Sequence, residues 1–150
     1  MKKSISVSLA VLFFVLLSFT GSSQYVARHN LSSSEYQAAF NEFSGTKKIR
    51  LADVSVYNRN GQETYAAIWD KKSSAGWAAR HAMNEGGYQT EVTTQKKAGF
   101  RPSRITAADI NGKLFFACIF YKTSAAWEAR HNMSSQQYQT LTACSSRPFC

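Results

Sequence analysis

The sequence predicts an α+β fold made of tandem repeats, each a three-stranded antiparallel meander with one helix, stacked side by side. Three observations support this prediction: a short motif recurs three times, a helix-start signal follows each copy, and an Asn-Gly pair divides each of two strand-like stretches. One such unit cannot bury its apolar face alone, so we expect neighbouring units to share a core.

The first 23 residues have the order of a secretory signal peptide. Two lysines precede an apolar run over residues 5–19, and small polar residues follow it. About 15 apolar residues are fewer than the ~20 that a helix needs to cross a bilayer. We therefore expect cleavage near Ser23 and Gln24, a secreted or periplasmic location, and no transmembrane segment in the mature chain. A retained membrane anchor is the alternative.

The mature chain, residues 24–150, is basic. It holds 16 Lys and Arg against 9 Asp and Glu, a net charge of about +7. Its length suffices for a single repeat domain with a real core. Several of the lysines fall in expected loops, where they either remain solvated or attract an anionic surface. We expect no nucleic acid partner, because the chain is exported and no nucleic-acid-binding motif appears.

The repeat is defined by five positions that are identical in three copies. Each copy holds Ala-Arg-His, and Tyr-Gln begins seven residues after the His. The motif blocks cover residues 25–37, 77–89 and 127–139. Two longer stretches between the blocks, 49–69 and 100–120, also match each other, whereas the third copy has no such stretch. The sequence therefore predicts two complete units and one partial unit that acts as an end cap.

A helix is expected to begin in each copy after a residue that suits the N-cap position. These residues are Ser32, Asn84 and Ser134. Glu35 and Gln137 lie three residues further on and complete a capping box in the first and third copies, whereas Gly87 breaks the box in the second. In the first copy Tyr36, Phe40 and Phe43 form an apolar stripe at helical spacing, with Gly45 as the expected stop.

Hairpins are expected where the two Asn-Gly pairs lie, because both residues of this pair tolerate the positive φ angles of a type I′ turn. The pairs are Asn60-Gly61 and Asn111-Gly112. Residues 77–83 alternate between two sets of side chains, which favours a third strand over a helix.

The pattern Trp127-Glu-Ala-Arg-His131-Asn-Met133 followed by Tyr138-Gln139, together with the strand Tyr65-Ala-Ala-Ile-Trp69 after an Asn-Gly turn, resembles the bacterial tandem repeat domain family. That family also supplies the N-terminal part of fungal polyglycine hydrolases. The resemblance covers nearly the whole mature chain and implies an extracellular repeat module. In those hydrolases the peptide-cleaving serine belongs to a separate C-terminal domain that resembles a β-lactamase, and we do not expect that domain here.

One short match to such hydrolases is present. Ser44-Gly45-Thr46-Lys47 fits the Ser-x-x-Lys pattern, in which the lysine helps to activate the serine. Its setting is the end of a predicted helix that runs into a loop, and the mature chain is too short for that hydrolase fold. We therefore expect no catalytic residue in this chain.

The three Arg-His pairs are the candidate ligand-binding residues: Arg28, Arg80, Arg130, His29, His81 and His131. In one interpretation each His packs on the helix and each Arg braces the turn between units. In the other, the arginines form a ladder on the opposite strand face that binds carboxylate or sulfate groups. We expect no metal site, because ligands ~50 residues apart on parallel units do not converge, and we expect no cofactor.

Three cysteines fit an oxidising compartment. Cys144 and Cys150 flank five residues and are a possible disulfide that would pin the C-terminal tail. Cys118 lies in an expected buried strand, where it serves as a small core residue. Other pairings remain open.

The sequence favours a secreted, non-catalytic repeat module that binds an extracellular protein, peptide or anionic glycan. One alternative is an accessory or remnant domain of a secreted serine hydrolase that acts on peptides. The other is a structural envelope protein without a small ligand.

Overall fold

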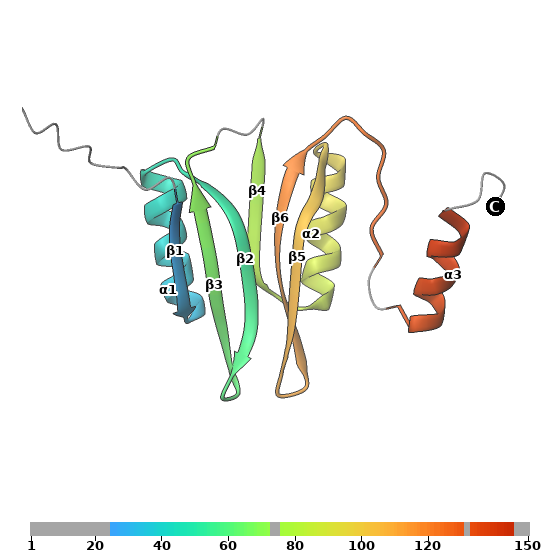
Figure 1. Cartoon of the computed structure of the whole chain (residues 1–150), viewed down its shortest axis with the longest axis horizontal. Coiled ribbons are helices and arrows are strands. Elements are labelled where there is room, and N and C mark those ends of the chain that lie inside the picture. The colour runs from blue at the N-terminus through green and yellow to red at the C-terminus, as the bar shows by residue number, and fades with distance from the viewer. Residues whose placement is uncertain (1–24, 73–75, 131–132, 146–150) are drawn as a thin grey trace, which may run out of the picture.

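The computed structural model describes residues 25–72, 76–130 and 133–145, and its fold is α+β, as the sequence predicted (Figure 1). Two three-stranded antiparallel sheets lie side by side, and each is accompanied by a helix. Within these ranges no helix is both long enough and apolar enough to span a bilayer. The predicted signal peptide lies outside the described residues.

The first repeat forms β1, α1, a π-helical turn η1, β2 and β3, and the second forms β4, α2, β5 and β6. Their bounds are β1 Tyr25–Leu31, α1 Ser33–Phe40, η1 Asn41–Thr46, β2 Arg50–Arg59, β3 Gln62–Asp70, β4 Trp77–Met83, α2 Glu85–Lys97, β5 Phe100–Ile110 and β6 Lys113–Lys122. The third repeat contributes α3, Ser135–Ser145. Trp77–Met83 is therefore a strand, as its alternation predicted.

The strand order corrects one detail of the predicted unit. A meander would place the strands in sequence order, but the sheets have the orders β1-β3-β2 and β4-β6-β5. The hairpin holds β3 beside β2, and the other edge of β2 faces β5 of the next repeat. The other edge of β3 therefore pairs with β1, and the two strands are antiparallel. The chain passes from β1 to β2 through α1.

All three predicted helix starts are confirmed. In the first copy the Ser32 Oγ accepts a hydrogen bond from the Glu35 N–H at 3.3 Å, and the Glu35 carboxylate accepts one from the Ser32 N–H at 2.8 Å. Ser134 and Gln137 repeat this capping box. Asn84 accepts a bond from the Gly87 N–H at 2.7 Å, and the reciprocal bond is missing because glycine has no side chain.

The end of the first helix differs from the prediction. The chain does not leave the helix at Gly45 but continues through the π-helical turn η1, and the left-handed residue is Lys48, with a φ of 56°. This wider turn carries Phe43, which is buried against the Trp69 ring at a centroid distance of 5.0 Å. The helical conformation thus extends past Gly45, through the turn that buries Phe43.

Both Asn-Gly pairs form the predicted hairpin turns. The φ angles are 53° and 78° at Asn60 and Gly61, and 55° and 77° at Asn111 and Gly112. Two consecutive positive values are the mark of a type I′ turn, whose twist suits a two-residue hairpin.

Two hydrophobic cores lie on opposite faces of the second sheet. The first core combines side chains of α1, η1, β2 and β3 with the near face of β6: Tyr36, Phe43, Leu51, Val54, Val56, Tyr65, Ala67, Trp69, Ala117 and Ile119. The second lies between β6 and α2: Tyr88, Val92, Phe116, Cys118 and Phe120. Because the first core draws on both repeats, the units share a core, as the sequence predicted.

The two sheets meet along β2 and β5, where equivalent positions of the two repeats lie next to each other. Arg104 forms an ion pair with Asp53, with Nε and Oδ1 2.8 Å apart. The Asn58 side-chain amide donates to the Asp109 carbonyl at 3.0 Å, and the Asn111 amide donates to the Gly61 carbonyl at 3.0 Å. Residues 50 or 51 apart thus form this seam, which sets the repeats in register.

Candidate functional site

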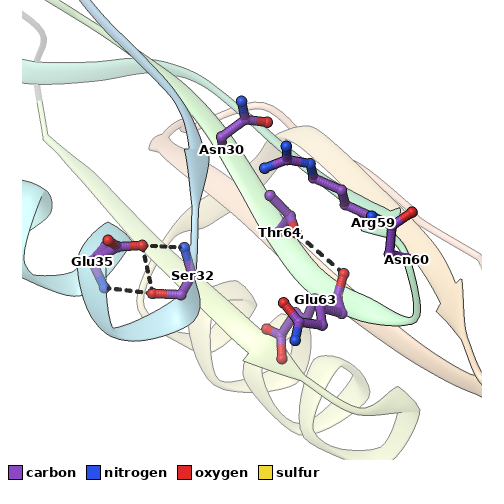
Figure 2. Close-up of a pocket in the computed structure, with 8 residues that line it drawn as sticks. Asn30, Ser32, Glu35, Arg59, Asn60, Glu63 and Thr64 are labelled. Carbon is purple, nitrogen blue, oxygen red and sulfur yellow. Dashed lines mark hydrogen bonds between the residues drawn. The ribbon is translucent and has the colours of Figure 1, made fainter.

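A polar cleft of about 370 Å³ lies on the first repeat beside its hairpin turn (Figure 2). Its lining comes from the end of β1, the start of α1 and the tip of the β2–β3 hairpin. The lining residues are Asn30, Ser32, Glu35, Arg59, Asn60, Gln62, Glu63 and Thr64.

Local backbone geometry positions these side chains. The β1–β3 pairing shifts register between Arg28 and Leu31, and Asn30 within this irregular stretch has a φ of 57°. The Tyr57 hydroxyl donates to the Asn30 Oδ1 at 3.0 Å and accepts from the Asn30 N–H at 3.1 Å, which fixes this conformation. Arg59 is the last residue of β2 and pairs with Gln62 across the turn. The cleft therefore lies where two irregular backbone segments meet.

Both carboxylates of the cleft accept hydrogen bonds from the protein. The Glu35 carboxylate accepts hydrogen bonds from the N–H and the hydroxyl of Ser32, the residue that caps α1. These hydrogen bonds lower the pKa of Glu35. The Glu63 carboxylate accepts from the Tyr65 hydroxyl. These contacts hold both acids toward the wall of the cleft.

Arg59 differs from these acids. Among the described residues it has no hydrogen-bond or ion-pair partner, and its side chain is exposed. Figure 2 shows its guanidinium extending from the hairpin toward the Asn30 end of the cleft. A guanidinium offers five donors in a planar fork that matches a carboxylate or sulfate. The cleft thus presents one available cation with amide groups around it.

The second repeat does not reproduce this chemistry. The counterparts of Asn30, Arg59 and Glu63 are Ala82, Ile110 and Leu114. Ile110 is buried, whereas Arg59 is exposed. The invariant positions of the repeat do not report this cleft, since most of its residues, though not Asn60, differ between the first copy and the second. A comparison of the variable positions was the signal that could have found it.

The three candidate arginines each make contacts within their own unit. The Arg28 guanidinium lies over the Phe43 ring, with Cζ 5.2 Å from the centroid. Arg80 pairs with Glu91 of α2 at 3.2 Å, and Arg130 pairs with Glu128 at 2.7 Å. Arg28 and Arg80 lie on separate sheets, each on the side of its own helix.

The candidate histidines occupy different environments. The His81 ring packs against Tyr36 at a centroid distance of 4.6 Å and against Tyr65 at 5.4 Å. Burial lowers the pKa of His81, an effect that Glu63 and a backbone hydrogen bond at Ser33 partly oppose. His29 is exposed on β1, and His131 lies outside the described residues. Within the described part of the chain, no three potential metal ligands come together.

The Ser-x-x-Lys match falls on the π-helical turn and the residue after it. The Ser44 Oγ accepts a hydrogen bond from the Trp69 indole at 3.1 Å. The Lys47 ammonium pairs with Glu42 at 2.5 Å and lies 4.7 Å from the centre of the Phe43 ring. Both side chains are thus held by contacts of the fold.

Cys118 is buried in the second core, as predicted, and burial raises the pKa of its thiol to about 12. The possible disulfide between Cys144 and Cys150 is not described by the structure: Cys150 lies outside the described residues, and only the backbone of Cys144 falls within α3.

Comparison with known proteins agrees with the repeat architecture. No curated protein matches this sequence. A family model described as a polyglycine hydrolase-like structural repeat matches three consecutive segments, residues 22–72, 74–123 and 124–143. These segments correspond to the three motif blocks and to the two sheet-forming repeats. The chain therefore belongs to the family of polyglycine hydrolase-like structural repeats.

Proposed function

We propose that this chain is a non-catalytic binding module that acts outside the cytoplasm and holds an anionic segment of a protein, peptide or glycan. The observation that carries this proposal is the exposed Arg59 guanidinium in the polar cleft, without an ion-pair partner among the described residues. A guanidinium in such a setting binds a carboxylate or sulfate through paired N–H donors.

The other groups of the cleft narrow the ligand class. Asn60 and Gln62 carry side-chain amides that both donate and accept, and the Glu63 carboxylate accepts. A ligand with one acidic group and several hydroxyl or amide groups satisfies this set. Uronic-acid glycans and peptides with a carboxylate side chain fit it better than densely sulfated chains, which the two glutamates repel.

The experiment is calorimetric titration of the exported chain against uronate-containing glycans, sulfated glycans, acidic peptides and glycine-rich peptides. Arg59→Ala is expected to weaken binding of the acidic ligand at least tenfold, and Arg59→Lys to restore only part of the affinity, because lysine lacks the planar fork. Arg101→Ala is the matched control, since Arg101 is an exposed strand arginine outside the cleft lining. Equal affinities for the Arg59→Ala and Arg101→Ala variants would contradict the assignment of the cleft.

A second candidate function, a structural role for the Arg-His pairs, is favoured by the packing of His81 on Tyr36 of the preceding repeat. In that case the array presents no small-ligand site at these pairs. Arg80→Ala and Arg130→Ala are then expected to lower the unfolding temperature and leave every affinity unchanged. Loss of binding in variants that keep their stability would instead assign the arginines to a ligand.

Export belongs to the same proposal and has its own test. The mass of the protein recovered from the medium or periplasm of an expressing cell is expected to correspond to a chain that begins at Gln24. Retention of the first 23 residues in a membrane fraction would favour a membrane-anchored module.

A further inference from the structure

We infer that two copies of this chain associate head to tail, with α3 of one copy packed on the outer face of the first sheet of the other. The outer face is the side of this sheet opposite α1, formed by Ala27, His29, Ser55, Ala66 and Ile68.

The second repeat shows what covers such a face. Its equivalent positions, Ala79, His81, Ala117 and Ile119, face the first repeat. Tyr36 of α1 packs on His81, and Phe40 packs on Trp77 of the same strand at a centroid distance of 5.9 Å. Ile119 is completely buried within the first core. The helix of the preceding repeat thus covers part of this face, together with side chains of β2 and β3 such as Tyr65, which also packs on His81.

The first sheet presents the same face without that helix. Ile68, the counterpart of Ile119, is 40% exposed, and Tyr25, the counterpart of Trp77, is 51% exposed. A largely apolar groove of about 260 Å³ runs over the face. The outer face is thus covered in the second repeat and open in the first. The open face leaves room for a repeat helix to pack on it.

Helix α3 is the complementary element. It follows the third motif block and carries Tyr138 at the position of Tyr36 and Tyr88. Tyr36 and Tyr88 are 1% and 2% exposed, whereas Tyr138 is 59% exposed. The α3 segment contains no charged residue, so it brings no charge of its own into the groove, whose lining also includes Arg28 and the Asp53 that pairs with Arg104.

The arrangement of the elements favours a second copy over the chain's own helix. In Figure 1 the first sheet and α3 lie toward opposite ends of the molecule, and the second sheet with α2 lies between them. The exposed residues 135–140 of α3 at one end and an exposed sheet face at the other form a heterologous pair of surfaces, which joins copies head to tail. In the pair that forms, Tyr138 of one copy meets His29 of the other, as Tyr36 meets His81 within the chain.

The test is sedimentation analysis of the exported chain from micromolar to near-millimolar concentration, with two single variants. Ile68→Glu disables the sheet face, and Tyr138→Glu disables the helix. Both positions are exposed within the chain, so we expect both variants to keep the circular dichroism spectrum and unfolding temperature of the dilute wild type. Leu114→Glu is the control, because Leu114 is 44% exposed and lies outside both surfaces.

The wild type and the Leu114→Glu control are expected to exceed the monomer mass as concentration rises, and each interface variant is expected to remain monomeric. An equimolar mixture of the two interface variants is expected to form a heterodimer that grows no further, because it joins the intact helix of one variant to the intact face of the other. A wild type that stays monomeric throughout overturns head-to-tail association. So does a Tyr138→Glu variant that self-associates normally, or a mixture that remains monomeric.

Discussion

The ring of His81 packs on the ring of Tyr36 with 4.6 Å between their centroids, and this contact joins the second repeat to the helix of the first. Both residues belong to the repeated motif, but they meet across the repeat boundary rather than within a unit. Tyr36 is therefore both a core residue of its own unit and a docking surface for the first strand of the next.

The Tyr36 contact predicts a large difference between equivalent residues of the repeat. Tyr36→Ala removes a buried ring that also packs on Tyr65, and we expect a loss of about 3–5 kcal/mol in the free energy of unfolding. Tyr138→Ala changes an exposed side chain and should cost less than about 0.5 kcal/mol in a dilute, monomeric sample. Urea unfolding measures both values. Similar losses in the two variants would contradict the assignment of Tyr36 to the shared core.

The His81 environment predicts a pH dependence of stability. Burial lowers the pKa of His81 in the folded chain below its unfolded value of about 6.5, so unfolding takes up a proton. The neutral ring therefore contributes its full stability above that pH, and the contribution is lost as the pH falls through the lower folded pKa. Between pH 7 and pH 5, His81→Phe should show a weaker decrease in stability than the wild type. An equal decrease in the two proteins would contradict the assignment of this pH dependence to the buried His81 ring.

Two ion pairs, one within the first sheet and one across the seam between the sheets, predict different energetic costs. Asp70 is buried and accepts a two-pronged contact from Arg50, which also lies over the Tyr121 ring of the second sheet. The hydrogen bonds from Arg50 lower the pKa of Asp70. Asp70→Asn leaves Arg50 largely buried without its counter-charge and should cost about 3–5 kcal/mol in the free energy of unfolding.

Asp53→Asn is the matched control for this substitution. Asp53 pairs with Arg104 at the seam, and both side chains are substantially exposed. Its loss should cost less than about 1 kcal/mol, and the cost should shrink at high salt. An equal cost for the two substitutions in chemical unfolding would mean that burial does not distinguish the pairs.

Two glycines predict opposite effects of the same substitution. Gly61 has a φ of 78°, and a Cβ added there would approach the Asn111 side chain to 3.3 Å, so Gly61→Ala should destabilise the chain by about 1–2 kcal/mol. Gly45 lies in the helical turn, and among the described residues no atom outside its own stretch of the helix lies within 4 Å of an added Cβ. Gly45→Ala should stabilise the chain by about 0.5–1 kcal/mol. Thermal unfolding gives both signs, and a destabilising Gly45→Ala would contradict the helical assignment of this turn.

The cysteines predict a specific thiol count. Cys118 is buried and its pKa is raised to about 12, so it should not react with a thiol reagent in the folded chain at pH 8. If Cys144 and Cys150 form the expected disulfide, denaturation without reductant exposes one thiol, and reduction exposes three. Mass spectrometry after alkylation counts them. Three thiols before reduction would exclude the disulfide.

The elements of this fold were predictable where local chemistry decides them. Ser32, Asn84 and Ser134 cap helices because their side chains accept the free N–H groups of a first turn, whatever lies around them. The Asn-Gly turns follow from the φ angles that these residues tolerate. The strand order and the π-helical turn depend on which sheet edge is free and on the burial of Phe43, and no local signal reports either of these.

The sequence by itself determined the repeat, the fold class, the helix starts, the hairpin turns and the burial of Cys118, because these follow from periodicity and from the preferences of single residues. Only the tertiary structure decided that His81 packs on the helix of the preceding unit and that Arg59 stands in a cleft without an ion-pair partner among the described residues. It also decided that one sheet face is covered and its equivalent open. The physical reason is that identical motifs acquire different surroundings according to their place in the array, and those surroundings exist only once the units have packed.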